Sequence, residues 1–276
     1  MAESTETQHY VTFDEAFHVM HYPAGESHIR STVIIDEIDN DELVIEMQVR
    51  GFEQLGQLLT ADAMLRRKGI RARWFVPYFP FARHDRRNDS NDGFELGVAL
   101  EMVRNIDIVL ADPHSDVAGQ LPHFAQAACV ARFAEAGLFA DDPVVVIPDA
   151  GATKKAHTWI DNGDSVQALK RRDPRTGKLS GFSVDSDDLA GRPCVIVDDI
   201  CDGGGTFLGL AKVLRQNNAG PLRLAVTHGL FTQGLDELLA DFDEIYFLAP
   251  TGAVASSTTA VRSIEFKVLY EKGNPQ

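Results

Sequence analysis

Apolar and polar positions along the chain follow two alternating patterns. Short apolar runs predict buried strands, and longer segments with apolar residues three and four positions apart predict helices. The first half has strands predicted at residues 32–36, 43–49, 72–77 and 107–111, and helices predicted at 54–68, 93–104 and 125–136.

A second series of the same kind begins at the apolar run Val144–Ile147. Its strands are predicted at residues 166–169, 193–197, 222–227, 244–248 and 264–269, and its helices at 152–160, 206–216 and 235–240. Such alternation predicts parallel sheets joined by right-handed crossovers. Because 276 residues leave room for two sheets, we predict an α/β fold with two doubly wound, mostly parallel-sheet domains, residues 9–138 and 139–276.

Composition narrows the classes of function. The chain is 44% apolar and 24% charged, as globular proteins are, and its net charge of −15 argues against nonspecific binding to nucleic acid or anionic membranes. No apolar run is long enough to span a bilayer, and three scattered cysteines suggest a reducing compartment. We therefore expect a cytoplasmic protein.

The most informative segment lies between residues 195 and 207. An apolar run ends in Asp198 and Asp199, and a third acid, three glycines and a threonine follow. Glycines allow close backbone approach, successive N–H groups at a helix start bind phosphate, and carboxylates accept hydrogen bonds from a sugar diol. An ordinary strand–turn–helix junction accounts for the glycines but not for the acids. The predicted ribose-phosphate-binding residues are Asp198, Asp199, Asp202, Gly203, Gly204, Gly205 and Thr206.

Three other polar motifs follow predicted strands. Residues 74–87 mix aromatic side chains with Arg83 and His84, which suits either a nucleotide site or a core cluster with a solvated rim. Asp112 and His114 suit a divalent metal, although a strand-end histidine is often structural. Asp149 precedes a turn of small residues, and it suits either magnesium or a plain turn.

A basic stretch runs from Lys170 to Lys178 and contains five basic residues in an otherwise acidic chain. Its Pro and Gly content predicts a mobile loop. The stretch is interpreted either as a solvated connector or as a flap that closes over a polyphosphate and excludes water.

Together, these motifs resemble the ribose-phosphate pyrophosphokinase family, which has the phosphoribosyltransferase type of α/β fold. The resemblance runs from about Tyr22 to Leu269. It rests on the segments Tyr22–Glu26, Pro77–Arg87, Asp112–His114, Pro148–Gly151, Lys170–Arg172 and Asp198–Thr206, in that order.

The resemblance implies a transferase that moves the β,γ-pyrophosphoryl group of ATP to ribose 5-phosphate, giving AMP and 5-phosphoribosyl 1-diphosphate for nucleotide biosynthesis. It implies catalytic roles for Lys170 and Arg172 and Mg²⁺ ligands at His114, Asp149 and Asp112. It also implies ATP contacts from Gly25, Glu26, Phe81, Arg83 and His84, with the first two supplied across a subunit interface. A homodimer or higher homo-oligomer follows, with no nucleic-acid or membrane partner.

Departures from the family pattern leave alternatives open. Ala24 replaces an acid and His84 replaces a glutamine, so the nucleotide end differs. Gly203–Gly205 lacks a threonine and leaves more room, which suits a larger acceptor such as ADP-ribose. A type I phosphoribosyltransferase shares only the glycine segment. A non-catalytic regulatory paralogue is expected to lack residues such as Lys170, which is present here.

Overall fold

The computed structural model describes residues 9–36, 43–87, 91–149, 152, 164–172, 179–249 and 260–266. The chain divides into two compact units, unit 1 (residues 1–124 with 275–276) and unit 2 (residues 125–274). Helix α5 (Gln126–Glu135) belongs to unit 2 because it packs on two of that unit's strands. The sequence predicts a domain boundary after residue 138. That boundary between independently folding domains stays a prediction.

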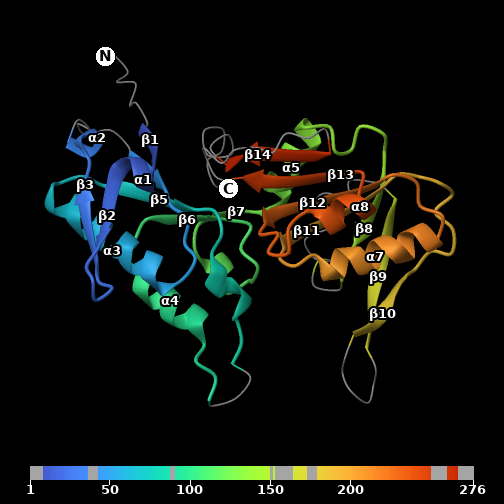
Figure 1. Ribbon diagram of the computed structural model, residues 1–276, viewed down its shortest axis with the longest axis horizontal. Helices are drawn as coiled ribbons and strands as arrows, with labels where there is room; N and C mark the ends of the chain where they lie inside the picture. The colour runs from blue at the N-terminus through green and yellow to red at the C-terminus, as the bar shows by residue number, and fades with distance from the viewer. Residues whose placement is uncertain are drawn as a thin grey trace. The chain divides into compact units, whose positions relative to one another are not determined.

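Unit 1 contains a five-stranded parallel sheet with the order β1-β4-β5-β6-β7 (Figure 1). The strands are β1 (His9–Thr12), β4 (Leu43–Glu46), β5 (Ala72–Val76), β6 (Ile108–Ala111) and β7 (His123–Phe124). The helices are α1 (Phe13–Ala16), α2 (Val33–Asp36), α3 (Phe52–Arg67) and α4 (Glu95–Val103), with 3₁₀ turns η1 (Pro80–Arg83) and η2 (Ala118–Gln120).

The core of unit 1 includes one buried polar link between helix and sheet. Trp74 on β5 is fully buried, and its indole N–H donates to Asp62 Oδ1 on α3 at 3.0 Å. Arg66 donates to the other oxygen of Asp62 at 2.5 Å. Because each buried polar group has a partner, the link fixes α3 against the sheet without an uncompensated charge.

The strand predicted at residues 32–36 is wrong. β2 (Phe17–His21) and β3 (Ser27–Ser31) form an antiparallel hairpin, and the chain then turns into the short helix α2. Ile35 is fully buried whereas Val33 is 72% exposed. The β-branched run favoured a strand, but a single helical turn that buries one of its side chains has too few residues to show a helical period.

Unit 2 contains a seven-stranded sheet with the order β10-β9-β8-β11-β12-β13-β14, in which β10 alone runs antiparallel to its neighbour. The strands are β8 (Val144–Ile147), β9 (Ser165–Arg172), β10 (Leu179–Val184), β11 (Cys194–Cys201), β12 (Leu222–Gly229), β13 (Glu244–Ala249) and β14 (Val261–Glu265).

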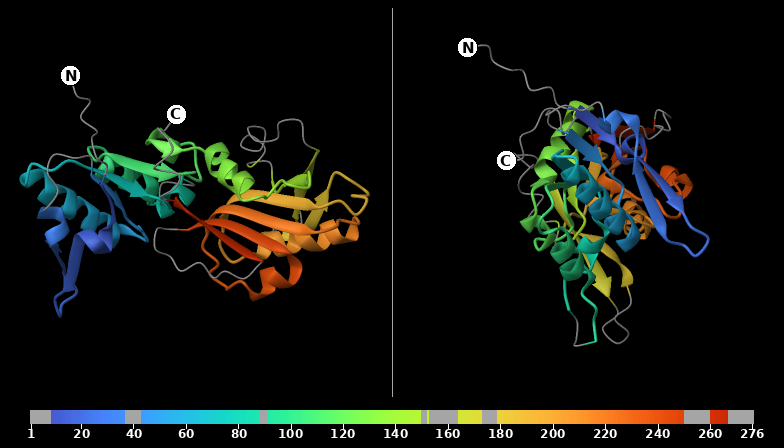
Figure 2. Two further views of the ribbon diagram at one scale, coloured as in Figure 1. Left: turned by 90° about the horizontal axis from the view of Figure 1, so that it is seen from above. Right: turned by 90° about the vertical axis from the view of Figure 1, so that its left-hand side faces the viewer.

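Helices cover both faces of this sheet (Figure 2). Phe133 of α5 meets Tyr246 of β13 edge to face at 6.4 Å between ring centroids. The neighbouring residue Ile245 faces the other way, into the cluster formed by α7 (Gly205–Gln216) and α8 (Asp236–Asp241). The alternation of side chains along β13 thus separates the two helical layers.

The strand order of unit 2 reverses between β8 and β11. The chain continues from β8 to β9 on one side of the sheet, and from β11 to β12 on the other. In open α/β sheets, ligands bind beyond the carboxyl ends of the strands at such a reversal. The topology therefore selects the ends of β8 and β11 as the place to look for a site.

Two predicted boundaries in unit 2 differ from the structure. β11 continues past residue 197 to Cys201, so Asp198 and Asp199 lie within the strand. Residues 170–172 lie in β9 and not in a loop, because antiparallel pairing with β10 places Lys170 opposite Phe182. Apart from Ala152, the predicted helix at 152–160 lies outside the described residues, as do residues 267–269 of the last predicted strand.

The remaining global expectations concern cysteines and membranes. All three cysteines are buried and free of disulfides. Within the described parts of the chain, every helix is too short or too polar to cross a bilayer.

Candidate functional site

Two adjacent carboxylates stand near the carboxyl end of β11. Asp198 lies opposite Val226 of β12 and is partly exposed, whereas Asp199 is 6% exposed. The Asp199 backbone N–H donates to Asp198 Oδ1 at 2.9 Å. Burial raises the pKa of Asp198 well above its usual range, and the negative charges of Asp199 and Asp149 raise it further.

Asp149 belongs to the same group of acids because β8 and β11 are parallel neighbours, with Val146 opposite Ile196. Its Oδ1 accepts the Ala152 N–H at 3.0 Å, which holds the carboxylate in the turn after β8. Three carboxylates from two strands thus converge at the strand-order reversal. Mutually repelling carboxylates at one place favour hydroxyl donors or a cation as the bound group.

The glycine loop, residues 202–206, links these acids to helix α7. Gly204 has φ of +80°, and a Cβ there would lie 3.2–3.4 Å from three carbons of Leu238. Gly205 begins α7, and a Cβ there would have no heavy atom within 4 Å. Glycine is therefore required at position 204 by the positive φ of the backbone. At position 205 the absence of a side chain leaves the backbone exposed beside the first N–H groups of the helix.

Cys201 precedes the glycine loop but is poorly suited to act as a nucleophile. It is fully buried, and burial together with the charges of Asp198 and Asp202 raises its pKa to about 12. A thiol in that state stays protonated at neutral pH. The chemistry of this site consequently rests on oxygen ligands and backbone N–H groups.

The hairpin of β9 and β10 carries the predicted catalytic residues Lys170 and Arg172. Phe182 of β10 packs on α7 at Gly209, where an added Cβ would lie 2.3 Å from the Phe182 ring. Because Gly209 has no side chain, the Phe182 ring can pack directly on α7, the helix that starts in the glycine loop. The side chains of Lys170 and Arg172 lie outside the described part of the structure.

The predicted nucleotide residues Gly25 and Glu26 form the turn between β2 and β3 in unit 1. The Gly25 N–H donates to the Tyr22 carbonyl at 2.9 Å, and the Glu26 carbonyl accepts the Tyr22 N–H at 2.9 Å. Gly25 has φ of +102°, which explains the residue type at the tip of the turn. Both residues are exposed, so the turn is available for contact.

The segment after β5 places aromatic and polar residues differently. Phe81 is 6% exposed and packs on Phe52 and Phe79, with ring centroids 4.6 Å and 5.1 Å away. Arg83 and His84 are exposed, and His84 Nδ1 lies 3.5 Å from Glu95 Oε2. Phe81 serves the core of unit 1, and the groups that face solvent are the arginine and the imidazole.

Asp112 and His114 follow β6 in unit 1, whereas Asp149 belongs to unit 2. Asp112 is 1% exposed, has φ of +39°, and donates its backbone N–H to the Phe124 carbonyl at 2.7 Å. His114 is exposed. Among the described residues, no three His, Cys, Asp or Glu side chains form a metal-holding group, so this ligand set stays a prediction.

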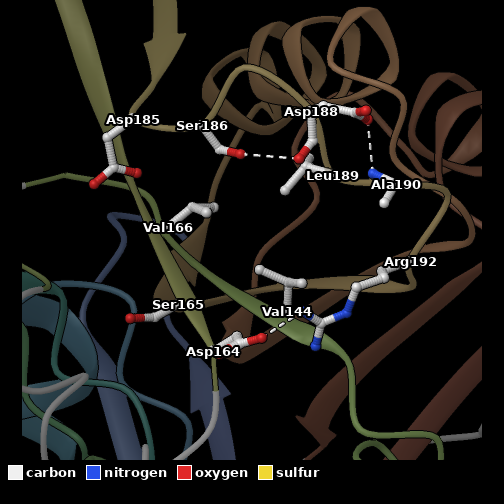
Figure 3. Close-up of a pocket in the computed structure, with 10 residues that line it drawn as sticks. All are labelled: Val144, Asp164, Ser165, Val166, Asp185, Ser186, Asp188, Leu189, Ala190 and Arg192. Carbon is white, nitrogen blue, oxygen red and sulfur yellow. Dashed lines mark hydrogen bonds and ion pairs between the residues drawn. The ribbon is translucent and has the colours of Figure 1, made fainter.

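A separate pocket of about 370 Å³ lies at the opposite end of the unit 2 sheet, beside the first residues of β8 and β9 (Figure 3). Its charged side chains have partners of their own. Arg192 pairs with Asp164, and the Asp188 carboxylate accepts the Ala190 N–H at 2.8 Å. The pocket contains none of the predicted site residues.

The sequence argument missed the segment after β12. Thr232 donates its hydroxyl to Asp202 Oδ1 at 2.7 Å, and Gln233 lies beside Gly203. No motif marks these residues. Their position after a strand that neighbours β11 was the available signal, since adjacent parallel strands end side by side.

The reversal in strand order, the acids and the glycine loop together define an α/β protein with a candidate ligand site at the carboxyl ends of a mostly parallel sheet. The crystal structure of phosphoribosylpyrophosphate synthetase from Mycobacterium smegmatis has this fold, with a TM-score of 0.75, 21% identity, and coverage of 94% of this chain and 91% of that one. The predicted fold class is thus confirmed.

Curated sequences show a similarity of the same kind. Ribose-phosphate pyrophosphokinases of Mycobacterium bovis and Mycobacterium tuberculosis are each 28% identical over 195 residues, which is 67% of this chain and 60% of each relative. The enzyme of that name from Hyphomonas neptunium is 28% identical over 257 residues, 86% of this chain and 80% of the relative. No protein-family model matches the chain. The chain is thus similar in sequence to ribose-phosphate pyrophosphokinases over two thirds or more of its length.

Proposed function

We propose that this chain is an enzyme that transfers the β,γ-pyrophosphoryl group of ATP to the anomeric hydroxyl of ribose 5-phosphate. The observation that carries the proposal is the placement of an acid-rich glycine loop at the strand-order reversal of unit 2. The names of the curated relatives support the same activity. The products are AMP and 5-phosphoribosyl 1-diphosphate.

The acids bind the sugar and the glycine loop binds its phosphate. Asp198 and Asp199 accept hydrogen bonds from the ribose hydroxyls, and backbone N–H groups around Gly205 donate to the 5-phosphate. Burial and the charges of Asp199 and Asp149 raise the pKa of Asp198, and hydrogen bonds from ribose hydroxyls favour its ionised form. The bound sugar is thereby held with its anomeric oxygen fixed for attack.

In the transfer step, the anomeric oxygen bonds to the β-phosphorus, and the bond from that phosphorus to the bridging α,β-oxygen breaks. AMP leaves with the bridging oxygen, and the anomeric hydroxyl loses its proton. Lys170 and Arg172 stabilise the negative charge on the transferring group as the basic hairpin approaches. Arg83 and His84 contact the nucleotide, and Gly25 and Glu26 do so across a subunit interface of a homodimer.

The available ligands fit magnesium, which prefers carboxylate oxygens and shares its coordination with substrate phosphates. Asp149 supplies such an oxygen beside the glycine loop, with His114 and Asp112 as the proposed partners. Mg²⁺ would neutralise charge on the ATP phosphates.

A second acceptor is favoured by one specific observation. An added Cβ at Gly205 would meet no heavy atom within 4 Å outside its neighbouring residues and its own helix, so the loop is open on this side. A ribose whose 5-phosphate is esterified, such as ADP-ribose, fits the same chemistry. The attacking oxygen and the leaving AMP are unchanged in this alternative.

The test is incubation with ATP and Mg²⁺ plus ribose 5-phosphate or ADP-ribose, followed by mass spectrometry of all products. We expect AMP and a diphosphorylated sugar with one acceptor or both, and no product from Asp198→Asn. AMP release without a nucleobase excludes a phosphoribosyltransferase. If the purified wild-type chain gives no diphosphorylated sugar with either acceptor, the proposal is wrong.

A further inference from the structure

The segment after β12, residues 230–234, lies beside the glycine loop. The N–H groups of Leu230 and Phe231 both donate to the Cys201 carbonyl, at 2.8 Å and 3.1 Å. The Thr232 N–H donates to the Asp202 carbonyl at 3.0 Å. Three backbone hydrogen bonds thus fix this segment to Cys201, the last residue of β11, and to Asp202, the first residue of the glycine loop.

The backbone of Phe231 is strained, which indicates that packing by neighbouring residues holds the segment in this conformation. Phe231 has φ of +44°, which is unfavourable for a bulky side chain. Its ring meets Phe247 edge to face at 5.2 Å, and it lies where a Cβ on Gly229 would be only 2.2 Å away. Such strain persists where packing over-determines a conformation, and it gathers at ligand sites.

One side chain of this segment, Thr232, forms a hydrogen bond with a side chain of the loop. The Thr232 hydroxyl donates to Asp202 Oδ1 at 2.7 Å, next to Gly203 and Gly204. Asp202 carries a negative charge at the start of a loop that would hold a phosphate. The hydrogen bond from Thr232 fixes one oxygen of this carboxylate and so limits the orientations in which it would repel a bound dianion.

We propose that Thr232 is a positioning residue for sugar-phosphate binding and acts through Asp202. This inference rests on the proposed function, because it takes the glycine loop as the phosphate site. Thr232 touches the loop and not the reacting atoms. Its loss should weaken binding of ribose 5-phosphate and leave the turnover of the saturated enzyme nearly unchanged.

The experiment measures the Kd for ribose 5-phosphate by calorimetry in Thr232→Val and Thr232→Ser. Valine keeps the shape and removes the donor, whereas serine keeps the donor. We expect Kd to rise about fivefold or more in the valine variant and to stay near wild type in the serine variant. In an Asp202→Asn background, Thr232→Val should have little further effect, because the neutral amide does not repel the phosphate in any orientation.

Thr60→Val is the matched control, since the exposed Thr60 hydroxyl donates to the Gly56 carbonyl within α3 of unit 1 and does not contact Asp202. The inference is overturned if Thr232→Val binds normally, if a folded Thr232→Ser binds as weakly as the valine variant, or if the effects of Thr232 and Asp202 add. A wild-type chain that binds ribose 5-phosphate without releasing AMP contradicts the proposed function alone. Binding of neither ribose 5-phosphate nor inorganic phosphate contradicts both.

Discussion

Gly204 and Gly205 are adjacent, yet replacing each by alanine should have opposite effects on stability. An L-residue at the φ of +80° seen at Gly204 costs about 1–2 kcal/mol, and the Cβ would also crowd three Leu238 carbons at 3.2–3.4 Å. We expect Gly204→Ala to lower the free energy of unfolding by about 2 kcal/mol. For a unit of this size, that corresponds to a fall in Tm of about 4–8 °C.

Gly205→Ala should be neutral or stabilising by up to about 1 kcal/mol, because alanine favours the helix and meets no neighbour within 4 Å. The same variant should bind ribose 5-phosphate poorly, since the added methyl group occupies the backbone surface proposed for the phosphate. Urea unfolding followed by circular dichroism, together with calorimetric titration, measures both quantities. Equal stability losses in the two variants, or normal binding by Gly205→Ala, would refute this account of the loop.

The remaining predictions concern a strand-end acid, the basic hairpin and the core of unit 1. Because the pKa of Asp198 is raised in the folded state, its ionisation destabilises the ligand-free protein as the pH rises from the unfolded value through the folded pKa. Asp198→Asn should therefore raise the Tm at neutral pH, flatten the pH dependence of Tm and abolish sugar binding; a lower Tm would contradict this. Lys170→Ala should lower kcat by about 10²–10⁴ without changing Tm, and near-normal turnover would reject its catalytic role. Trp74→Phe should cost about 2–3 kcal/mol in urea unfolding, because Asp62 loses a buried donor and a small cavity forms, and a loss below about 0.5 kcal/mol would contradict the structural link.

Most strands and helices could be predicted because burial imposes a period on the sequence. The apolar runs before Asp149 and Asp198 place both acids near the carboxyl ends of strands, although β11 continues three residues past Asp198. Short local elements escaped the same argument. α2 has four residues, too few to show a helical period, and the basic residues of β9 look like a loop until pairing with β10 is known.

For the site, the sequence predicted the chemistry of single residues but not which residues lie next to one another in space. Three acids and three glycines in one segment already indicate a ligand with hydroxyl and phosphate groups. The reason that Gly204 is essential while Gly205 is open depends on a backbone angle and on Leu238, which lies more than thirty positions away. Thr232 is a surface threonine in the sequence, and its bond to Asp202 appears only once β11 and β12 lie side by side.

The sequence by itself determined the α/β class, the position of the glycine loop and the charged groups available to it, because hydrophobic period and residue chemistry are local properties. Tertiary structure alone decided which side of β8 each later strand occupies, and therefore that Asp149, Asp198 and Asp199 meet at the strand-order reversal. Strand order depends on packing between segments distant in the chain, and such contacts leave no periodic trace in any one segment.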